Sequence, residues 1–179
     1  AASAALDRAL AIDPKAKHAR YNLALIFESE GHGAEAAAAY RREIADHPTN
    51  FKAFFNLGRL LEGMGDPAGA LAALRSAVAA NEEYGVGRLF LSRALLATGD
   101  LAGAEREALR GLALDSKGPF TPLGHYVLAD VYSRQGRGDE AAREARLGQE
   151  AEARTASAAR AAKAAGAGSS QVAEGEPES

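Results

Sequence analysis

Few residues in this chain have the types and spacing that catalysis or metal binding requires. Its four histidines lie far apart in the sequence, and none belongs to an HExxH motif or to a pair with metal-ligand spacing: they are His18, His32, His47 and His125. The absence of cysteine excludes disulfides, thiolate metal sites and cysteine nucleophiles. No GxxxxGK loop, GxSxG motif or GxGxxG motif after a strand is present. We therefore predict a chain that is not an enzyme and has no metal site and no cofactor.

Two arginines offer a different chemistry, which is the recognition of anions. Arg59 and Arg93 are 34 residues apart, and a guanidinium group can bind a carboxylate through two parallel hydrogen bonds. Two interpretations are open for them. They contact carboxylates of a bound polypeptide, or they form ion pairs with Glu62 and neighbouring residues of the chain itself.

A skeleton of apolar and small residues repeats every 34 residues and predicts the elements that hold these side chains. Three sets of residues recur at this interval: Leu23, Leu57 and Leu91; Gly31, Gly65 and Gly99; and Ala36, Ala70 and Ala104. A fourth copy, with Leu128 and Gly136, comes three residues late because the connection at 115–123 is longer. A period of 34 residues is typical of stacked helix pairs, so we predict an all-α fold in which each glycine marks the turn between two helices.

Composition supports this fold and excludes several functions. The chain has 179 residues, of which 47% are hydrophobic and only 6% aromatic, and much of the hydrophobic fraction is alanine, the best helix former. The net charge is -3, so no overall positive field attracts nucleic acid. No run of about 18 apolar residues is present, which argues against a membrane span. Arginine outnumbers lysine and alanine is abundant, which suggests a bacterial source and suits cytoplasm and periplasm equally.

The repeats divide the chain into four predicted segments. Residues 1–14 form the second helix of a truncated repeat, which ends before Pro14. Residues 15–148 form four helix pairs, and residues 149–165 extend the last helix or cap the array. Residues 166–179 are acidic and contain too little apolar surface to fold, so we predict that they are disordered.

The repeated pattern resembles the tetratricopeptide repeat family over roughly residues 1–148. In one copy the resemblance rests on these residues: Leu23, Ala24, Phe27, Ala36, Tyr40 and Pro48. The chain departs from the family pattern where Arg20 and Arg88 replace a large residue and Glu43 replaces an alanine. The resemblance implies a right-handed α-solenoid of stacked antiparallel helix pairs, in which a continuous core forms between neighbouring repeats.

The same resemblance implies that the first helices of the pairs line a concave groove that binds a peptide or a partner helix. The residues expected in the groove are Tyr21, Asn22, Lys52, Phe55, Asn56, Arg59, Phe90, Arg93, Tyr126 and Asp130. Asn22 and Asn56 occupy positions at which related co-chaperones hold the terminal carboxylate of a peptide. That clamp also needs basic residues in the third copy, where this chain has Val86 and Phe90. In repeats without a clamp, asparagine at this position bonds neighbouring backbone.

Four large side chains have two interpretations. Phe55, Leu89, Phe90 and Tyr126 form an exposed apolar strip, which would mark a partner site, or Phe55 and Leu89 turn inward against the adjacent helix.

The favoured function is a non-catalytic protein–protein interaction scaffold. A first alternative is a carboxy-terminal appendage of a larger bacterial enzyme, because the stretch PFTPLGHYVLADVYSRQGR resembles the tails of sulfatase-like hydrolases. A second alternative is self-association through the truncated amino-terminal face, where Leu6 and its neighbours lack a covering helix. The expected partner in each case is a protein or a peptide.

Overall fold

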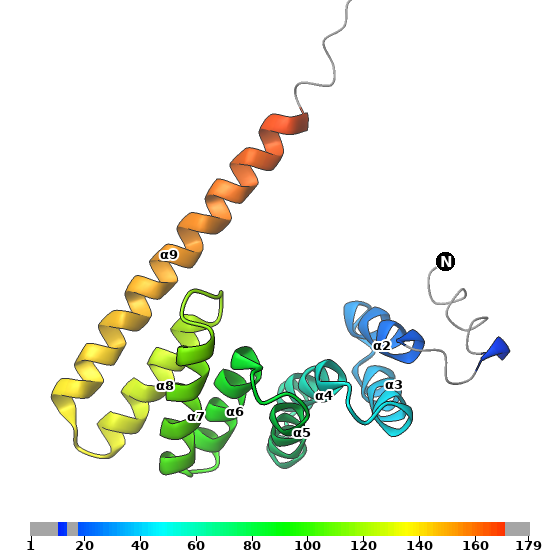
Figure 1. Ribbon diagram of the computed structural model, residues 1–179, viewed down its shortest axis with the longest axis horizontal. Coiled ribbons are helices and arrows are strands. Elements are labelled where there is room, and N and C mark those ends of the chain that lie inside the picture. The colour runs from blue at the N-terminus through cyan, green and yellow to red at the C-terminus, as the bar shows by residue number, and fades with distance from the viewer. Residues whose placement is uncertain (1–10, 14–17, 171–179) are drawn as a thin grey trace, which may run out of the picture.

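The computed structural model describes residues 11–13 and 18–170, with side chains to residue 164, and these residues form an array of helices without strands (Figure 1). The helices are α2 (Ala19–Ser29), α3 (Gly33–Asp46), α4 (Phe51–Gly63), α5 (Pro67–Ala80), α6 (Gly85–Ala97), α7 (Leu101–Leu114), α8 (Thr121–Arg134) and α9 (Gly138–Ser170). The predicted all-α fold is confirmed.

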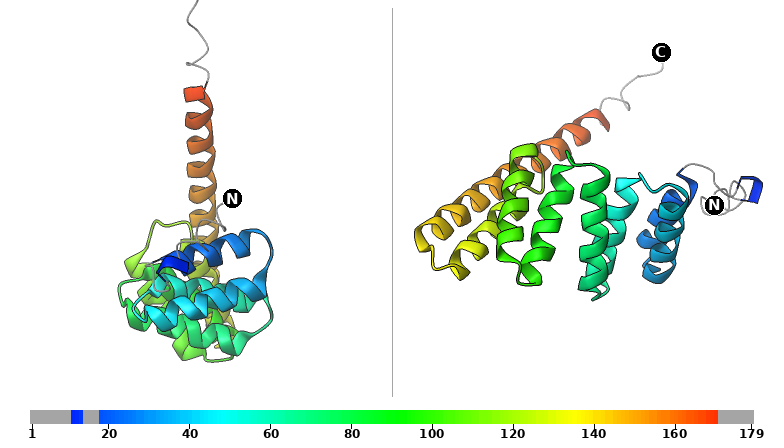
Figure 2. Two further views of the ribbon diagram at one scale, coloured as in Figure 1. Left: turned by 90° about the vertical axis from the view of Figure 1, so that its right-hand side faces the viewer. Right: turned by 60° about the horizontal axis from the view of Figure 1, so that its bottom comes forward.

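The helices are arranged as consecutive antiparallel pairs, α2 with α3, α4 with α5, α6 with α7 and α8 with α9. The second helix of each pair also packs on the first helix of the next, so that α3 contacts α4, α5 contacts α6 and α7 contacts α8. Figure 2 shows the pairs side by side along the array, with α9 extending well past its partner α8. This is the predicted solenoid, in which one pair alone has no closed core and each pair covers its neighbour.

Four glycines make the same turn between the two helices of each pair. Gly31, Gly65, Gly99 and Gly136 have φ between +76° and +83°, a region that other residues rarely adopt. After each of them, the next amide donates a hydrogen bond to the carbonyl five residues earlier, as Asp66 does to Leu61 at 2.9 Å. This bond caps the first helix. Glycine at this point of every repeat is therefore explained by backbone geometry.

The core is built between neighbouring helices and depends on close approach. One cluster lies around Tyr40 and Leu57, and a larger one runs from Phe55 to Tyr132. Gly58 of α4 lies against Leu74 of α5, where an added Cβ would be only 2.7 Å from Leu74 Cγ. Small residues on the skeleton thus let paired helices approach each other, which the alanine-rich composition favours.

The predicted segment boundaries meet the structure at the two ends. Helix α9 is continuous from Gly138 to Ser170, so residues 166–170 are helical and not disordered as predicted. The prediction of a disordered tail over 171–179 lies outside the described residues. Most of the predicted truncated helix at 1–14 does too, although Ala11 and Ile12 are helical.

Candidate partner-binding face

The ten residues expected in the groove all lie on α2, α4, α6 and α8. We call the surface that these four helices share the first-helix face. Tyr21 and Asn22 come from α2, Lys52 to Arg59 from α4, and the remaining four residues from α6 and α8. Side-chain contacts join α2 to α4 and α4 to α6, so much of the predicted set is brought together. Its role in binding stays a prediction.

An ion-pair ladder connects successive first helices across this face. Arg59 of α4 pairs with Glu28 of α2, and Arg93 of α6 pairs with Glu62 of α4 at 2.5 Å. The two pairs are related by the 34-residue repeat. Of the two interpretations of these arginines, the structure shows the ion pairs within the chain.

Hydrogen bonds extend the ladder at its α2 end. The Asn56 side-chain amide donates to the Tyr21 hydroxyl at 3.0 Å, and the Tyr40 hydroxyl donates to Glu28 at 3.1 Å. Burial of the Tyr40 hydroxyl, followed by the negative charge of Glu28, raises the pKa of Tyr40 above its usual value. Glu28 therefore accepts from two helices and fixes how α2 and α4 sit against each other.

The cations of the ladder are more accessible than the anions. The Arg59 side chain is 42% exposed and its partner Glu28 only 20%, while Arg93 is 39% exposed and Glu62 32%. Asn22 and Lys52 are exposed as well. The exposed arginines keep some N–H donors available at the surface. Their exposed ion pairs contribute only about 0–1 kcal/mol to the stability of the fold.

The large apolar side chains of the face turn inward. Phe55, Leu89 and Phe90 are all buried, so the interpretation as an exposed apolar strip is wrong and the inward orientation is confirmed for Phe55 and Leu89. The Phe90 ring packs edge-on against Phe55, with centroids 5.0 Å apart, and against Phe120, at 5.1 Å. These rings hold α4, α6 and the start of α8 together. The guanidinium of Arg93 covers Phe90 at 4.7 Å from the ring centroid.

The sequence did not single out Phe120, which lies at the start of α8 and is partly exposed. The sequence feature that could have pointed to Phe120 is the longer connection at 115–123, because its extra residues have no equivalent in the other repeats. The inserted segment supplies a ring that covers Phe90.

The two predicted residues on α8 make contacts away from the ladder. The Tyr126 hydroxyl donates to Glu152 of α9 at 2.8 Å, and this hydrogen bond raises the pKa of the exposed Tyr126 above its usual value. Asp130 binds Arg134 of its own helix through two hydrogen bonds of 2.9 Å. The structure therefore does not join Tyr126 and Asp130 to the polar residues of α2 and α4.

Two hollows lie near the amino-terminal ends of first helices. One, of about 360 Å³, is lined by His18, His47, Thr49, Asn50, Phe51 and Lys52. The other, of about 370 Å³, lies between the residues preceding α8 and the middle of α9, and Lys117 and Arg154 are among its lining residues. In the described part of the chain, no three metal-ligating side chains come together. None of its helices is both long and apolar enough to span a bilayer.

Family models identify the repeat. Three models described as tetratricopeptide repeat match residues 1–51, 61–119 and 122–147, which together make up most of the chain. The chain belongs to the tetratricopeptide repeat family. No curated protein sequence gives a significant match.

Solved structures share the fold of this tetratricopeptide repeat protein at low sequence identity. A crystal structure of MamA superposes with a TM-score of 0.75 and 19% identity, covering 87% of this chain and 89% of MamA. YrrB, described as a TPR protein with an unusual peptide-binding site, has a TM-score of 0.72 and 22% identity over 90% of this chain and 81% of YrrB. PilF of Pseudomonas aeruginosa has a TM-score of 0.70 and 23% identity over 82% of this chain and 65% of PilF.

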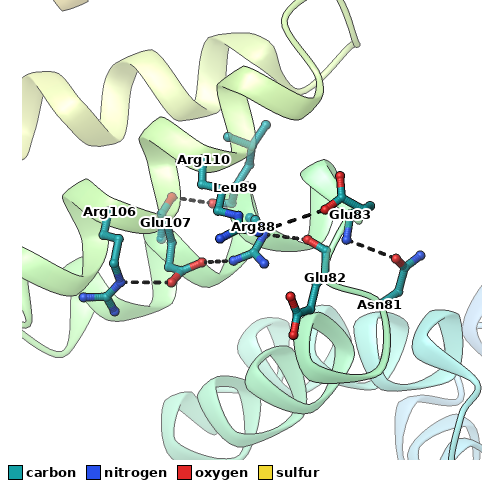
Figure 3. Close-up of polar contacts among 9 residues, drawn as sticks. Asn81, Glu82, Glu83, Arg88, Leu89, Arg106, Glu107 and Arg110 are labelled. Carbon is teal, nitrogen blue, oxygen red and sulfur yellow. Dashed lines mark hydrogen bonds and ion pairs between the residues drawn. The ribbon is translucent and has the colours of Figure 1, made fainter.

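The residues that depart from the tetratricopeptide pattern are paired inside the structure. Arg88, which is buried, binds Glu107 of α7 at 2.6 Å and donates through Nε to the Glu82 carbonyl at 2.9 Å, as Figure 3 shows. Arg20 pairs with Asp46 of α3. These polar pairs connect the two helices of a repeat where the family has a large apolar residue.

Glu43 is the remaining departure, and it is also buried. It accepts a hydrogen bond of 2.9 Å from the Asn50 side-chain amide, and the Asn50 side-chain oxygen accepts from the Ala53 amide at the start of α4. Glu43 thus orients the residue that caps the next helix. Its role is structural.

Proposed function

We propose that this chain is a non-catalytic protein-interaction scaffold that holds an extended peptide or a partner helix against the first-helix face. Membership of the tetratricopeptide repeat family supports the class of interaction scaffold. The observation that carries the proposal further is the exposure of three side chains with N–H donors on α2 and α4: Asn22, Lys52 and Arg59. These side chains present donors that the chain itself uses only in part.

The donors favour a partner segment that is rich in acceptors. The Arg59 guanidinium has five N–H donors, of which Glu28 engages only part, and the Lys52 ammonium has no carboxylate partner among the described residues. An acidic side chain or an exposed peptide carbonyl would satisfy them. The YrrB likeness in fold is compatible with peptide binding, since that protein is described as having a peptide-binding site.

The residues of α6 argue against a carboxylate clamp. Val86 and Phe90 stand at the positions where the clamp needs basic groups, and Phe90 is also buried. The polar contacts would therefore come from α2 and α4, while Tyr126 and Phe120 offer partly exposed rings toward the other end. We expect an acidic residue of the partner near Arg59.

The test compares two faces of the molecule. Peptides are selected from a displayed random library on the wild-type chain, and their affinities are measured by fluorescence anisotropy for a double variant, Asn56→Ala with Arg59→Ala. We expect at least about tenfold weaker binding, because a hydrogen bond to a charged group contributes about 1.5–3 kcal/mol. Salt should also weaken wild-type binding.

Arg75→Ala is the matched control, because Arg75 is an exposed arginine of a second helix, α5. It should bind the selected peptides like the wild type, and circular dichroism should show unchanged helicity for all variants. Equal affinity of the double variant and the wild type would contradict the proposed face.

A further inference from the structure

The hollow beside α9 takes no part in the proposed contacts of the first-helix face, and we call it the α9 hollow. Its volume is about 370 Å³. One wall comes from the connection before α8, with Lys117 and Pro119, and the other from the middle of α9, with Arg154 and Ala158. Ligand sites typically measure about 300–1,000 Å³, so this hollow suits a small group.

Both walls of the α9 hollow depart from the repeat. The connections from α3 to α4 and from α5 to α6 are residues 47–50 and 81–84, whereas the connection from α7 to α8 is longer, residues 115–120. Helices α3, α5 and α7 have 14 residues each, and 14 residues counted from Gly138 would end α9 at Ala151. Arg154 and Ala158 therefore lie on a part of α9 that the other second helices lack (Figure 1). The stacking of repeats explains neither addition, and the two additions meet at this hollow.

The charges of the α9 hollow are positive. Lys117 and Arg154 are cationic and exposed, and no acidic side chain is found among the described residues that line the hollow. Neither cation makes a hydrogen bond or an ion pair with another residue of the described part of the chain. The carboxylate of Asp115 lies outside the lining, against Gly118, where an added Cβ would be 2.2 Å from Asp115 Oδ2. The hollow thus brings together two positive charges that the chain does not pair.

The two threonines of the hollow use their hydroxyl protons within the chain. The Thr121 hydroxyl donates to the Asp115 carbonyl at 3.1 Å, and the Thr155 hydroxyl donates to the Glu152 carbonyl at 2.8 Å. The side-chain donors that remain for a ligand are therefore the N–H groups of the lysine and the arginine. These groups suit an anion, and Ala158 is among the apolar residues that can contact the organic part of such a ligand.

We propose that the α9 hollow binds a phosphate monoester, with Arg154 and Lys117 as the residues that hold the phosphate. A guanidinium group donates to two oxygens at once, which leaves the third terminal oxygen of the phosphate for the ammonium group. A phosphate monoester carries about −1.5 to −2 charges at pH 7 and so balances both cations. A carboxylate has one charge and two oxygens, and it balances only one of them. The inference does not depend on the proposed partner of the first-helix face.

A titration followed by NMR tests the proposal on the full chain. The chain is labelled with ¹⁵N and titrated with O-phosphoserine at constant ionic strength, and the amide chemical shifts give the dissociation constant. We expect the largest shifts at Gly118, Thr121 and Thr155. Arg154→Gln should weaken binding at least about tenfold, because it removes hydrogen bonds from a charged donor, and Lys117→Gln should weaken it as well. Glutamate, which carries carboxylates and no phosphate, should bind at least about tenfold more weakly than phosphoserine.

Arg160→Gln is the matched control. Arg160 is an exposed arginine of the same part of α9, and it does not line the hollow. This variant should bind phosphoserine like the wild type. Because Arg154 and Lys117 make no contact of their own that holds the fold together, circular dichroism should show the same helicity for all three variants.

A second arm distinguishes the possible sources of the phosphate. Glycerol phosphate is compared with a short peptide that carries one phosphoserine between alanines. Tighter binding of the peptide would support the site and identify a phosphorylated polypeptide as the source, whereas tighter binding of glycerol phosphate would support the site and identify a small ester.

Three results would overturn the proposal. The absence of shifts at the amides of the hollow would show that no phosphate binds there. Equal affinity for glutamate and phosphoserine would show that the hollow does not select phosphate. An equal loss of affinity in Arg154→Gln and Arg160→Gln would show a general attraction to the positive charges of α9 without a defined site.

Discussion

The two halves of the first-helix face, α2 with α4 and α6 with α8, share the repeated skeleton but carry different residues at one equivalent position. Asn22, Asn56 and Phe90 occupy the same place in consecutive repeats. Asn56 is half-buried and bonds Tyr21 of the preceding first helix, whereas Phe90 is buried between two rings. The α2–α4 half therefore keeps polar groups at the surface, and the half around α6 uses the equivalent position to join three helices.

This difference shows that the repeated residues determine where the helices and turns lie, whereas the residues between them determine whether the surface is polar or apolar. The residues before α8 strengthen the contrast, since Phe120 adds a second ring against Phe90. The two ladder arginines are exposed to a similar extent and both are ion-paired, and Arg93 also lies over the Phe90 ring.

The largest expected effect comes from removing the ring that joins α4, α6 and α8. Phe90→Ala should lower the free energy of unfolding by about 4 kcal/mol, because it removes a buried aromatic side chain and its packing with Phe55 and Phe120. Urea unfolding followed by circular dichroism measures the change.

Asn56→Ala is the control for this experiment, as it alters the equivalent position one repeat earlier. It removes one partly exposed hydrogen bond to Tyr21 and should cost about 1 kcal/mol or less. If the two substitutions destabilise the chain equally, the two halves do not differ in the way that their contacts indicate.

A smaller effect is expected from breaking the buried ion pair. Glu107→Ala leaves the buried Arg88 without its carboxylate, which should lower the free energy of unfolding by about 3 kcal/mol. Asp46→Ala breaks the more exposed pair with Arg20 in the first half of the array and should cost about 1 kcal/mol or less.

The double replacement Arg88→Leu with Glu107→Leu separates the two causes of such a loss. It removes both charges and returns a large apolar residue to a position where the family usually has one. We expect a free energy of unfolding close to that of the wild type, since a buried ion pair rarely stabilises a protein more than a well-packed apolar pair does. A double variant as unstable as Glu107→Ala would show that the pair itself stabilises the repeat.

The fold was predictable from the sequence because its determinants recur at one interval. Four glycine turns with positive φ and the alanines of the close contacts follow directly from the 34-residue skeleton. The segment boundaries that rest on residues outside the described part stay predictions.

The site was less predictable because side-chain direction depends on neighbours that a helical wheel does not contain. Phe90 turns inward because its ring packs against Phe55 and Phe120, and Phe120 belongs to the longer connection that the other repeats lack. The partner of Arg88 is 19 residues away on α7, a spacing that no sequence motif marks. The positions of the groove residues on the first helices were predictable, but their burial was not.

The smallest effect concerns pH and compares a partly buried tyrosine, Tyr84, with an exposed one, Tyr126. Tyr84 packs its ring against Phe51 and Phe55, and burial raises its pKa to about 12. The folded state therefore holds the Tyr84 proton more tightly than the unfolded state, whose tyrosine pKa is about 10. The stabilisation is complete below about pH 10 and is lost as the pH rises from about 10 to about 12.

Urea unfolding at several values between pH 8 and pH 11 measures this loss. Tyr84→Phe should make the free energy of unfolding fall less steeply above pH 10. Tyr40 and Tyr132, whose pKa values are also raised by burial, would contribute to the remaining fall. Tyr126→Phe should change the slope less, because Tyr126 is exposed and its pKa is raised mainly by the hydrogen bond to Glu152. If the slope responds to Tyr126→Phe and not to Tyr84→Phe, the packing of Tyr84 against Phe51 and Phe55 does not raise the pKa of Tyr84, and the proposed cause of the pH dependence is wrong.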